Sequence, residues 1–253
     1  MDFKLKGKVA LVTGAGSQIG FGKEIALTLA REGCEAIGIT DINLDDAKLT
    51  AEAVKAAGAK SIAVRADVTN PEDVGAMVKE IADEFGKIDI LCNVAGAILG
   101  GGPLEEQSKE LWEKEVALNL FGPMIVCQAV IPYMKKQGGG SIVNISSSSS
   151  KMYSLGVMAY ASAKGAVDTF SKQLATVEAG NNIRVNCVAP GPSPTNFIKA
   201  QDKEAVMEVL KKEIPLGRAT TPQDIAVATV FFASELSADI SGQVLHVSGA
   251  SVM

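Results

Sequence analysis

Tyr160 and Lys164 stand four residues apart in Tyr160-Ala161-Ser162-Ala163-Lys164, a stretch with helical character. Residues at i and i+4 share one helix face, so the phenol and the ammonium can point into one cleft. A tyrosine acting as a base near neutral pH needs its pKa lowered by roughly three units, or about 4 kcal/mol, which one ammonium about 4 Å away can supply. Taken alone, the spacing is more typical of an exposed helix pair, so the acid–base hypothesis depends on the rest of the chain.

A strand, a glycine-rich turn and a helix follow one another near the N-terminus. They are Val9–Thr13, the turn Gly14-Ala-Gly16-Ser-Gln-Ile-Gly20-Phe-Gly22, and the helical stretch Lys23–Arg31. Glycines let the backbone approach a pyrophosphate, whose charge is held by free amide hydrogens at the helix end. This order predicts a dinucleotide-binding turn.

Asp41 closes the next apolar strand, 21 residues beyond Gly20. A carboxylate there can bind the two ribose hydroxyls of NAD and repels the extra phosphate of NADP. No arginine follows in residues 41–46, so we expect NAD as the cofactor. The alternative is a helix cap, for which Asn43 is at least as good a candidate.

Short β-branched runs alternate with helical stretches along the whole chain, which predicts an α/β fold. We expect strands near 8–13, 35–40, 61–66, 88–93, 141–146, 183–189 and 243–247. The alternation predicts a Rossmann-like, doubly wound parallel sheet of about seven strands in a single domain, residues 1–253. Ligands of such sheets bind at the carboxyl ends of the strands, where Thr13, Asp41, Asp67, Asn93, Ser147 and Pro190 all fall.

The ordered motifs resemble the short-chain dehydrogenase/reductase family, in its classical branch, over essentially the whole chain. The similar segments are Thr13-Gly14 to Gly20, Asp67-Val68, Cys92-Asn-Val-Ala-Gly96, Asn119 seven residues after Trp112, Ser147 thirteen before Tyr160, Pro190-Gly191 to Thr195, Pro215-Leu-Gly-Arg218 and Pro222-Gln-Asp-Ile-Ala226. The resemblance implies hydride transfer between NAD and a carbinol carbon. It implies that Tyr160 exchanges the proton, Ser147 binds the reacting oxygen, Lys164 also holds the nicotinamide ribose, and Asn119 anchors a water.

By the same resemblance, we expect the cofactor contacts to be Gly14, Ser17, Gln18, Ile19, Gly20, Asp41, Ile42, Asp67, Val68, Asn93, Ala95, Gly96, Tyr160, Lys164, Pro190, Gly191, Ser193 and Thr195. Three positions depart from the family pattern. Gln18 replaces a small residue, so its side chain could crowd the cofactor. Val94 replaces a second asparagine and removes one amide from a sheet-supporting position. Ser248 and Ala250 replace an acid and a glycine near the C-terminus.

The predicted substrate contacts are Ile98, Ser147, Lys151, Met152, Tyr153 and Phe197, with a helical lid over about residues 193–215. Mostly apolar, they favour a hydrophobic secondary alcohol or its ketone. Lys151 could pair with a substrate carboxylate or a coenzyme A phosphate, although a solvated lysine is the more ordinary interpretation. One alternative is an NAD-linked 3-hydroxyacyl-CoA dehydrogenase or 3-oxoacyl thioester reductase. Another is a catalytically silent subunit, against which the complete set Asn119, Ser147, Tyr160 and Lys164 argues.

The composition is typical of one acidic globular enzyme domain, with 253 residues, 47% hydrophobic residues and a net charge of −5. It argues against nucleic-acid binding. No uninterrupted apolar run reaches membrane-spanning length, so we expect a cytoplasmic protein without membrane insertion. Cys34, Cys92, Cys127 and Cys187 are expected to be buried free thiols, and the single histidine, His246, a partly buried strand residue, so no metal site is expected. The family resemblance implies a homo-oligomer, a tetramer or a dimer.

Overall fold

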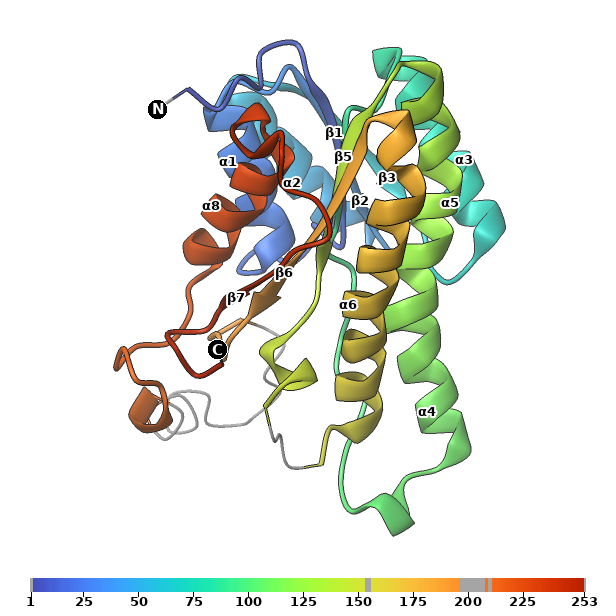
Figure 1. The fold of residues 1–253 in the computed structure, drawn as a ribbon. Helices are drawn as coiled ribbons and strands as arrows, with labels where there is room; N and C mark the ends of the chain where they lie inside the picture. Colours follow the sequence, from blue (N-terminus) through green and yellow to red (C-terminus); the bar gives the residue numbers. More distant parts are fainter. Residues whose placement is uncertain (1, 153–155, 196–207, 209–210, 253) are drawn as a thin grey trace.

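The computed structural model describes residues 2–152, 156–195, 208 and 211–252 (Figure 1). Seven strands form one sheet in the order β3-β2-β1-β4-β5-β6-β7, and every neighbouring pair is parallel. The strands are β1 (Val9–Thr13), β2 (Ala36–Asp41), β3 (Lys60–Arg65), β4 (Ile90–Asn93), β5 (Gly140–Ile145), β6 (Ile183–Pro190) and β7 (Val244–Val247). The predicted doubly wound fold is confirmed, and all seven strands lie where the apolar runs indicated.

Helices cover both faces of this sheet (Figure 1). One face carries α1 (Phe21–Arg31), α2 (Leu44–Ala56) and α8 (Pro222–Ala233). The other carries α3 (Pro71–Phe85), α4 (Lys109–Val116), α5 (Gly122–Lys136) and α6 (Met158–Glu178). A separate apolar cluster fills each interface, so the central strands are buried on both sides, as a parallel sheet requires. Short 3₁₀ turns are η1 (Leu104–Glu106), η3 (Ser148–Ser150), η4 (Ala179–Asn181) and η5 (Glu235–Ser237).

Local sequence explains where several helices begin. Asn43 caps α2 by accepting from the backbone N–H groups of Asp45 and Asp46, as its alternative role in the sequence indicated. Asn70 caps α3 in the same way, with Pro71 in the first turn. Thr221 and Asp224 form a reciprocal capping box at the start of α8.

A π-helical turn, η2 (Ala117–Phe121), joins α4 to α5 and contains Asn119. Such widened turns often occur at functional positions.

The continuous helical stretch Lys109–Lys136 is long and apolar enough, judged by length and composition alone, to cross a membrane. Its packing against α3 and α6 is also that of an ordinary core helix in a folded domain.

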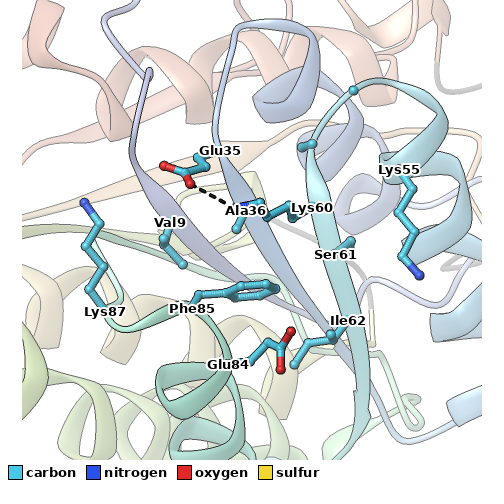
Figure 2. Close-up of a pocket in the computed structure, with 12 residues that line it drawn as sticks. Val9, Glu35, Ala36, Lys55, Lys60, Ser61, Ile62, Glu84, Phe85 and Lys87 are labelled. Atoms are coloured by element: carbon cyan, nitrogen blue, oxygen red, sulfur yellow. Dashed lines mark hydrogen bonds and ion pairs between the residues drawn. The ribbon is translucent and has the colours of Figure 1, made fainter.

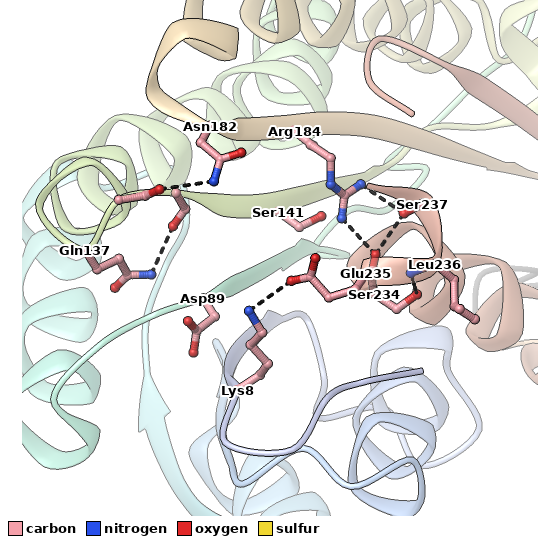
Figure 3. A network of polar contacts seen from close by, with 12 residues as sticks. Lys8, Asp89, Gln137, Ser141, Asn182, Arg184, Ser234, Glu235, Leu236 and Ser237 are labelled. Carbon is pink, nitrogen blue, oxygen red and sulfur yellow. Dashed lines mark hydrogen bonds and ion pairs between the residues drawn. The ribbon is translucent and has the colours of Figure 1, made fainter. Parts of the chain in front are cut away.

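The amino-terminal edge of the sheet is occupied by structural contacts. A groove of about 680 Å³ at the start of β1, β2 and β3 contains lysines that are already ion-paired, such as Lys60 with Glu35 at 3.2 Å (Figure 2). At the start of β6, the Arg184 guanidinium donates to the Ser237 hydroxyl and to the Ser234 carbonyl, which ties the strand to the chain after α8 (Figure 3). Ligands of parallel sheets bind at the opposite edge, at the carboxyl ends of the strands.

Candidate active site

Four predicted catalytic side chains converge at the carboxyl edge of the sheet. Ser147 follows β5, Tyr160 and Lys164 lie on the first turns of α6, and Asn119 lies in the π-helical turn. All four are buried, with exposed fractions of 8% for Ser147, 4% for Tyr160, 3% for Lys164 and 0% for Asn119. Such desolvation strengthens the electrostatic interactions among them.

Lys164 is held from two sides. Its ammonium donates to the Ile145 carbonyl oxygen at 2.9 Å and lies 5.8 Å from the centre of the Tyr160 ring. Burial lowers the pKa of Lys164 to about 8, against the opposing effects of Cys187, Asp168 and Glu115. The ammonium is therefore still mostly charged at neutral pH.

The predicted depression of the Tyr160 pKa is not found; burial raises this pKa well above its usual range. A hydrogen bond with Ser147 opposes the rise, and the negative charge of Glu115 adds to it. Helical spacing places Lys164 beside the ring, but its ammonium is directed to the Ile145 carbonyl. Desolvation of the phenol is the largest effect on its pKa.

Asn119 is fixed by a closed set of hydrogen bonds. Its amide nitrogen donates to the Ala97 carbonyl at 2.9 Å, and its amide oxygen accepts from the Ala97 N–H at 3.2 Å. A Cβ placed on Gly96 would lie 2.8 Å from the Asn119 Oδ1 and 3.3 Å from the Lys164 Nζ. Gly96 therefore lets both polar groups approach the same stretch of backbone.

Sequence reasoning missed Glu115, whose carboxylate has an exposed fraction of 0% in α4. Its Oε2 accepts from the Asn119 amide at 2.8 Å, and its Oε1 accepts from the Leu99 N–H at 2.6 Å. The available signal was the spacing of four between Glu115 and Asn119, which places the two residues on one helix face. Glutamate is so often solvated that this spacing alone does not distinguish it.

The glycine-rich turn has the features of a pyrophosphate site. Helix α1 has Gly20 as its N-cap and so lacks a side-chain cap, which leaves its first N–H groups for a ligand. The Ser17 hydroxyl in this turn and the Ser193 hydroxyl beyond β6 are buried with no hydrogen-bond partner in the described part of the chain. A Cβ on Gly14, whose φ is +63°, would lie 2.6 Å from the Ala95 Cα. These predicted cofactor residues therefore fit a dinucleotide.

Asp41 is positioned by the turn itself. Its Oδ2 accepts from the Gly16 N–H at 2.8 Å, and its Oδ1 accepts from the Asn43 N–H at 3.0 Å. Each carboxylate oxygen keeps a lone pair for a ribose hydroxyl. Gly16 is required here, because a Cβ at that position would lie 2.7 Å from the Asp41 Cγ.

Gln18 does not crowd the site. Its amide nitrogen donates to the Gly16 carbonyl at 2.6 Å and lies 3.3 Å from the Thr50 hydroxyl in α2, and its oxygen accepts from Lys23. The side chain is thus folded back between the turn and α2, and the steric conflict expected from the sequence is absent. Ile19 and Ile42 are exposed at 49% and 61%.

The remaining cofactor candidates occupy the same edge with different exposures. Asp67 and Val68 follow β3, and Pro190, Gly191 and Thr195 are buried at and beyond the end of β6. The Asn93 side chain is buried among β4, β5 and α5, where it donates to the Asn144 amide oxygen at 2.9 Å. Its amide therefore supports the sheet and does not face the cleft; any cofactor contact would have to come from its backbone. Val94 packs against the apolar core.

The predicted substrate residues are only partly described. Ile98 and Met152 are half-buried, and Lys151 is exposed. Tyr153 and Phe197 lie outside the described residues. So does the larger part of the lid expected over residues 193–215.

The cysteines and His246 take the positions expected. Cys34, Cys92, Cys127 and Cys187 are free and buried, and burial raises the pKa of the Cys187 thiol to about 12. His246 is a half-buried residue of β7. Within the described ranges, no three histidine, cysteine, aspartate or glutamate side chains are placed to hold a metal ion.

Comparison with known proteins agrees with this geometry. A family model described as Enoyl-(Acyl carrier protein) reductase matches residues 14–250. The 7alpha-hydroxysteroid dehydrogenase of Escherichia coli K12 is 35% identical over 99% of this chain and 96% of its own. The 3-oxoacyl-[acyl-carrier-protein] reductase FabG of Chlamydia muridarum is 40% identical over 98% and 99%.

A solved structure of a 7alpha-hydroxysteroid dehydrogenase complexed with NADH and 7-oxo glycochenodeoxycholic acid superposes with a TM-score of 0.93. It is 34% identical and covers 99% of this chain and 96% of its own. The chain belongs to the short-chain dehydrogenase/reductase family and is an oxidoreductase.

Proposed function

We propose that this protein is an NAD-dependent oxidoreductase that interconverts a hydrophobic secondary alcohol and its ketone. The observation that carries the proposal is the convergence of Ser147, Tyr160, Lys164 and Asn119 beside a turn that holds Asp41. The relative solved with NADH and an oxo bile acid acts on a substrate of this class, which supports the proposal.

When bound, NAD supplies the hydride donor or acceptor at C4 of its nicotinamide. Tyr160 donates the proton to the carbonyl oxygen during reduction, and its raised pKa keeps it protonated at neutral pH. The Ser147 oxygen accepts from the Ser149 N–H at 3.1 Å, and its hydroxyl is also hydrogen-bonded to Tyr160, so it can turn its proton to the reacting oxygen when substrate binds. Lys164 places a buried positive charge near the phenol, which favours proton loss from Tyr160 during oxidation.

Asp41 favours NAD over NADP because its carboxylate repels an additional phosphate. The first test is titration of the purified protein with NADH and with NADPH, following nicotinamide fluorescence. We expect tighter binding of NADH by about tenfold or more. Equal or inverted preference would refute the role of Asp41, and binding of neither would support the silent-subunit alternative.

A second candidate function is an NAD-linked 3-hydroxyacyl-CoA dehydrogenase or 3-oxoacyl thioester reductase, which the likeness to FabG favours. Initial rates with NADH and either 7-oxo glycochenodeoxycholic acid or acetoacetyl-CoA separate the two candidates. Tyr160→Phe should lower the turnover of whichever probe the wild type reduces by about a hundredfold or more, while the affinity for NADH is unchanged. Substantial turnover by that variant would refute the assignment of Tyr160.

A cytoplasmic location and assembly as a homotetramer or homodimer also belong to the proposal. Exposed apolar side chains on the α4–α5 and α6 surfaces, such as Phe121 and Val177, support the association.

A further inference from the structure

Glu115 places a carboxylate in the protein interior. Its exposed fraction is 0%, and in the described part of the chain no lysine or arginine forms an ion pair with it. Burial of a carboxylate is costly unless hydrogen bonds compensate for the lost water. Three N–H groups do so here, from Leu99 at 2.6 Å, Gly100 at 3.3 Å and the Asn119 amide at 2.8 Å.

These three bonds connect two different parts of the site. The Glu115 Oε1 holds the backbone of residues 99–100, which adjoins the predicted substrate contact Ile98. The Glu115 Oε2 holds Asn119, which is bonded on its other side to both backbone groups of Ala97. Residues 97–100, Glu115 and Asn119 therefore form one closed network, and Asn119 faces Lys164 across Gly96.

We propose that Glu115 is a positioning residue of the active site, which fixes Asn119 and the substrate-side backbone of residues 99–100 in a single arrangement. The proposal rests on the proposed function, since it gives Asn119 a part in the reaction. Glu115 also acts electrostatically, because its negative charge raises the pKa of both Tyr160 and Lys164. The other groups that act on these two residues are Ser147, Cys187 and Asp168.

Glu115→Gln tests the network without changing the volume of the side chain. The new NH₂ group must face either the Asn119 amide nitrogen or the Leu99 N–H, so in both orientations two donors oppose each other. One of the two connections is lost, and so is the charge. The matched control is Glu113→Gln, because Glu113 lies in the same helix but is exposed and paired with Lys109 at 2.9 Å.

The first measurement is hydrogen exchange of the peptide that contains residues 97–100, read by mass spectrometry. We expect Glu115→Gln to exchange about tenfold faster at Leu99 and Gly100, while Glu113→Gln stays at the wild-type rate. NADH affinity should stay within about twofold of the wild-type value, because the turn around Gly16 is untouched. Unchanged exchange at Leu99 and Gly100 would overturn the proposal.

The second measurement is the pH profile of ketone reduction with 7-oxo glycochenodeoxycholic acid or acetoacetyl-CoA. We expect kcat to fall about tenfold or more, with a smaller change in KM, and the profile to move to lower pH because the negative charge is gone. Faster exchange combined with unaltered kcat and pH profile would show that Glu115 only supports the fold, which also overturns the proposal.

Failure of the proposed function gives a different pattern. If the wild type reduces neither probe, the proposed substrate class loses its support, and the role of Glu115 is decided by exchange and by the titration of Lys164. That titration is followed as the pH dependence of the stability difference from Lys164→Met. Its midpoint should fall in Glu115→Gln, and an unmoved midpoint would exclude the electrostatic role.

Discussion

Lys164 should destabilise the folded enzyme at neutral pH, and Lys164→Met should remove that cost. The folded pKa of about 8 lies below the ordinary value of 10.5. At about 1.4 kcal/mol per pH unit, this gap corresponds to about 3 kcal/mol of lost stability at pH 7. Methionine fills a similar volume but leaves the Ile145 carbonyl without its donor, a pH-independent cost of about 1–3 kcal/mol.

The pH dependence separates these two effects. Between pH 8 and 10.5 the unfolded chain holds a proton on Lys164 that the folded chain has lost, so wild-type stability rises with pH relative to the variant. Below pH 8 both states are protonated, and the cost is present in full. Between pH 7 and pH 10, the unfolding free energy of the wild type should therefore rise by about 2 kcal/mol relative to that of Lys164→Met. Cys187 stays a thiol in the folded state over this range, since its pKa is about 12.

The assay is urea unfolding of both proteins at several pH values, with the difference in unfolding free energy plotted against pH. Lys172→Met is the matched control, because it removes an exposed ammonium from the same helix and should give a small difference without this trend. A difference between wild type and Lys164→Met that stays flat within about 0.5 kcal/mol would refute the reasoning, since burial would then impose no proton-linked cost.

Two further substitutions test the positions that hold the site together. Gly96→Ala would place a Cβ 2.8 Å from the Asn119 Oδ1. We therefore expect the free energy of unfolding in urea to fall by about 1–2 kcal/mol and kcat to fall as well. The control is Gly75→Ala, which has open space around it and should leave stability unchanged or raise it. Wild-type kcat in Gly96→Ala would contradict the close approach. Asp41→Asn sets an amide N–H against the Gly16 or Asn43 N–H and removes the charge, so NADH should bind more weakly and discrimination against NADPH should fall about tenfold. An unchanged ratio of the two dissociation constants in the fluorescence titration would show that Asp41 does not select the cofactor.

The sequence by itself determined the order of strands and helices, and it predicted which candidate catalytic residues converge. These features depend on local causes: β-branched runs between polar stretches, an asparagine before α2, and glycines between β1 and α1. Because all strands are parallel, residues that follow them must gather at one edge. The sequence alone therefore predicts that Ser147 and Tyr160 lie close together.

Only the tertiary structure decided the electrostatics and the side-chain directions. Helical spacing indicated a Tyr160 pKa lowered by Lys164, yet desolvation by residues distant in sequence raises it. Gln18 turns toward α2 because Asp46 and Thr50, on that separate helix, give its amide nitrogen two further acceptors. Glu115 is of a residue type that is usually solvent-exposed, yet it is buried and bonded to Asn119 and to the backbone of residues 99–100. Burial and hydrogen-bond partners arise from contacts between distant segments, which no local pattern specifies.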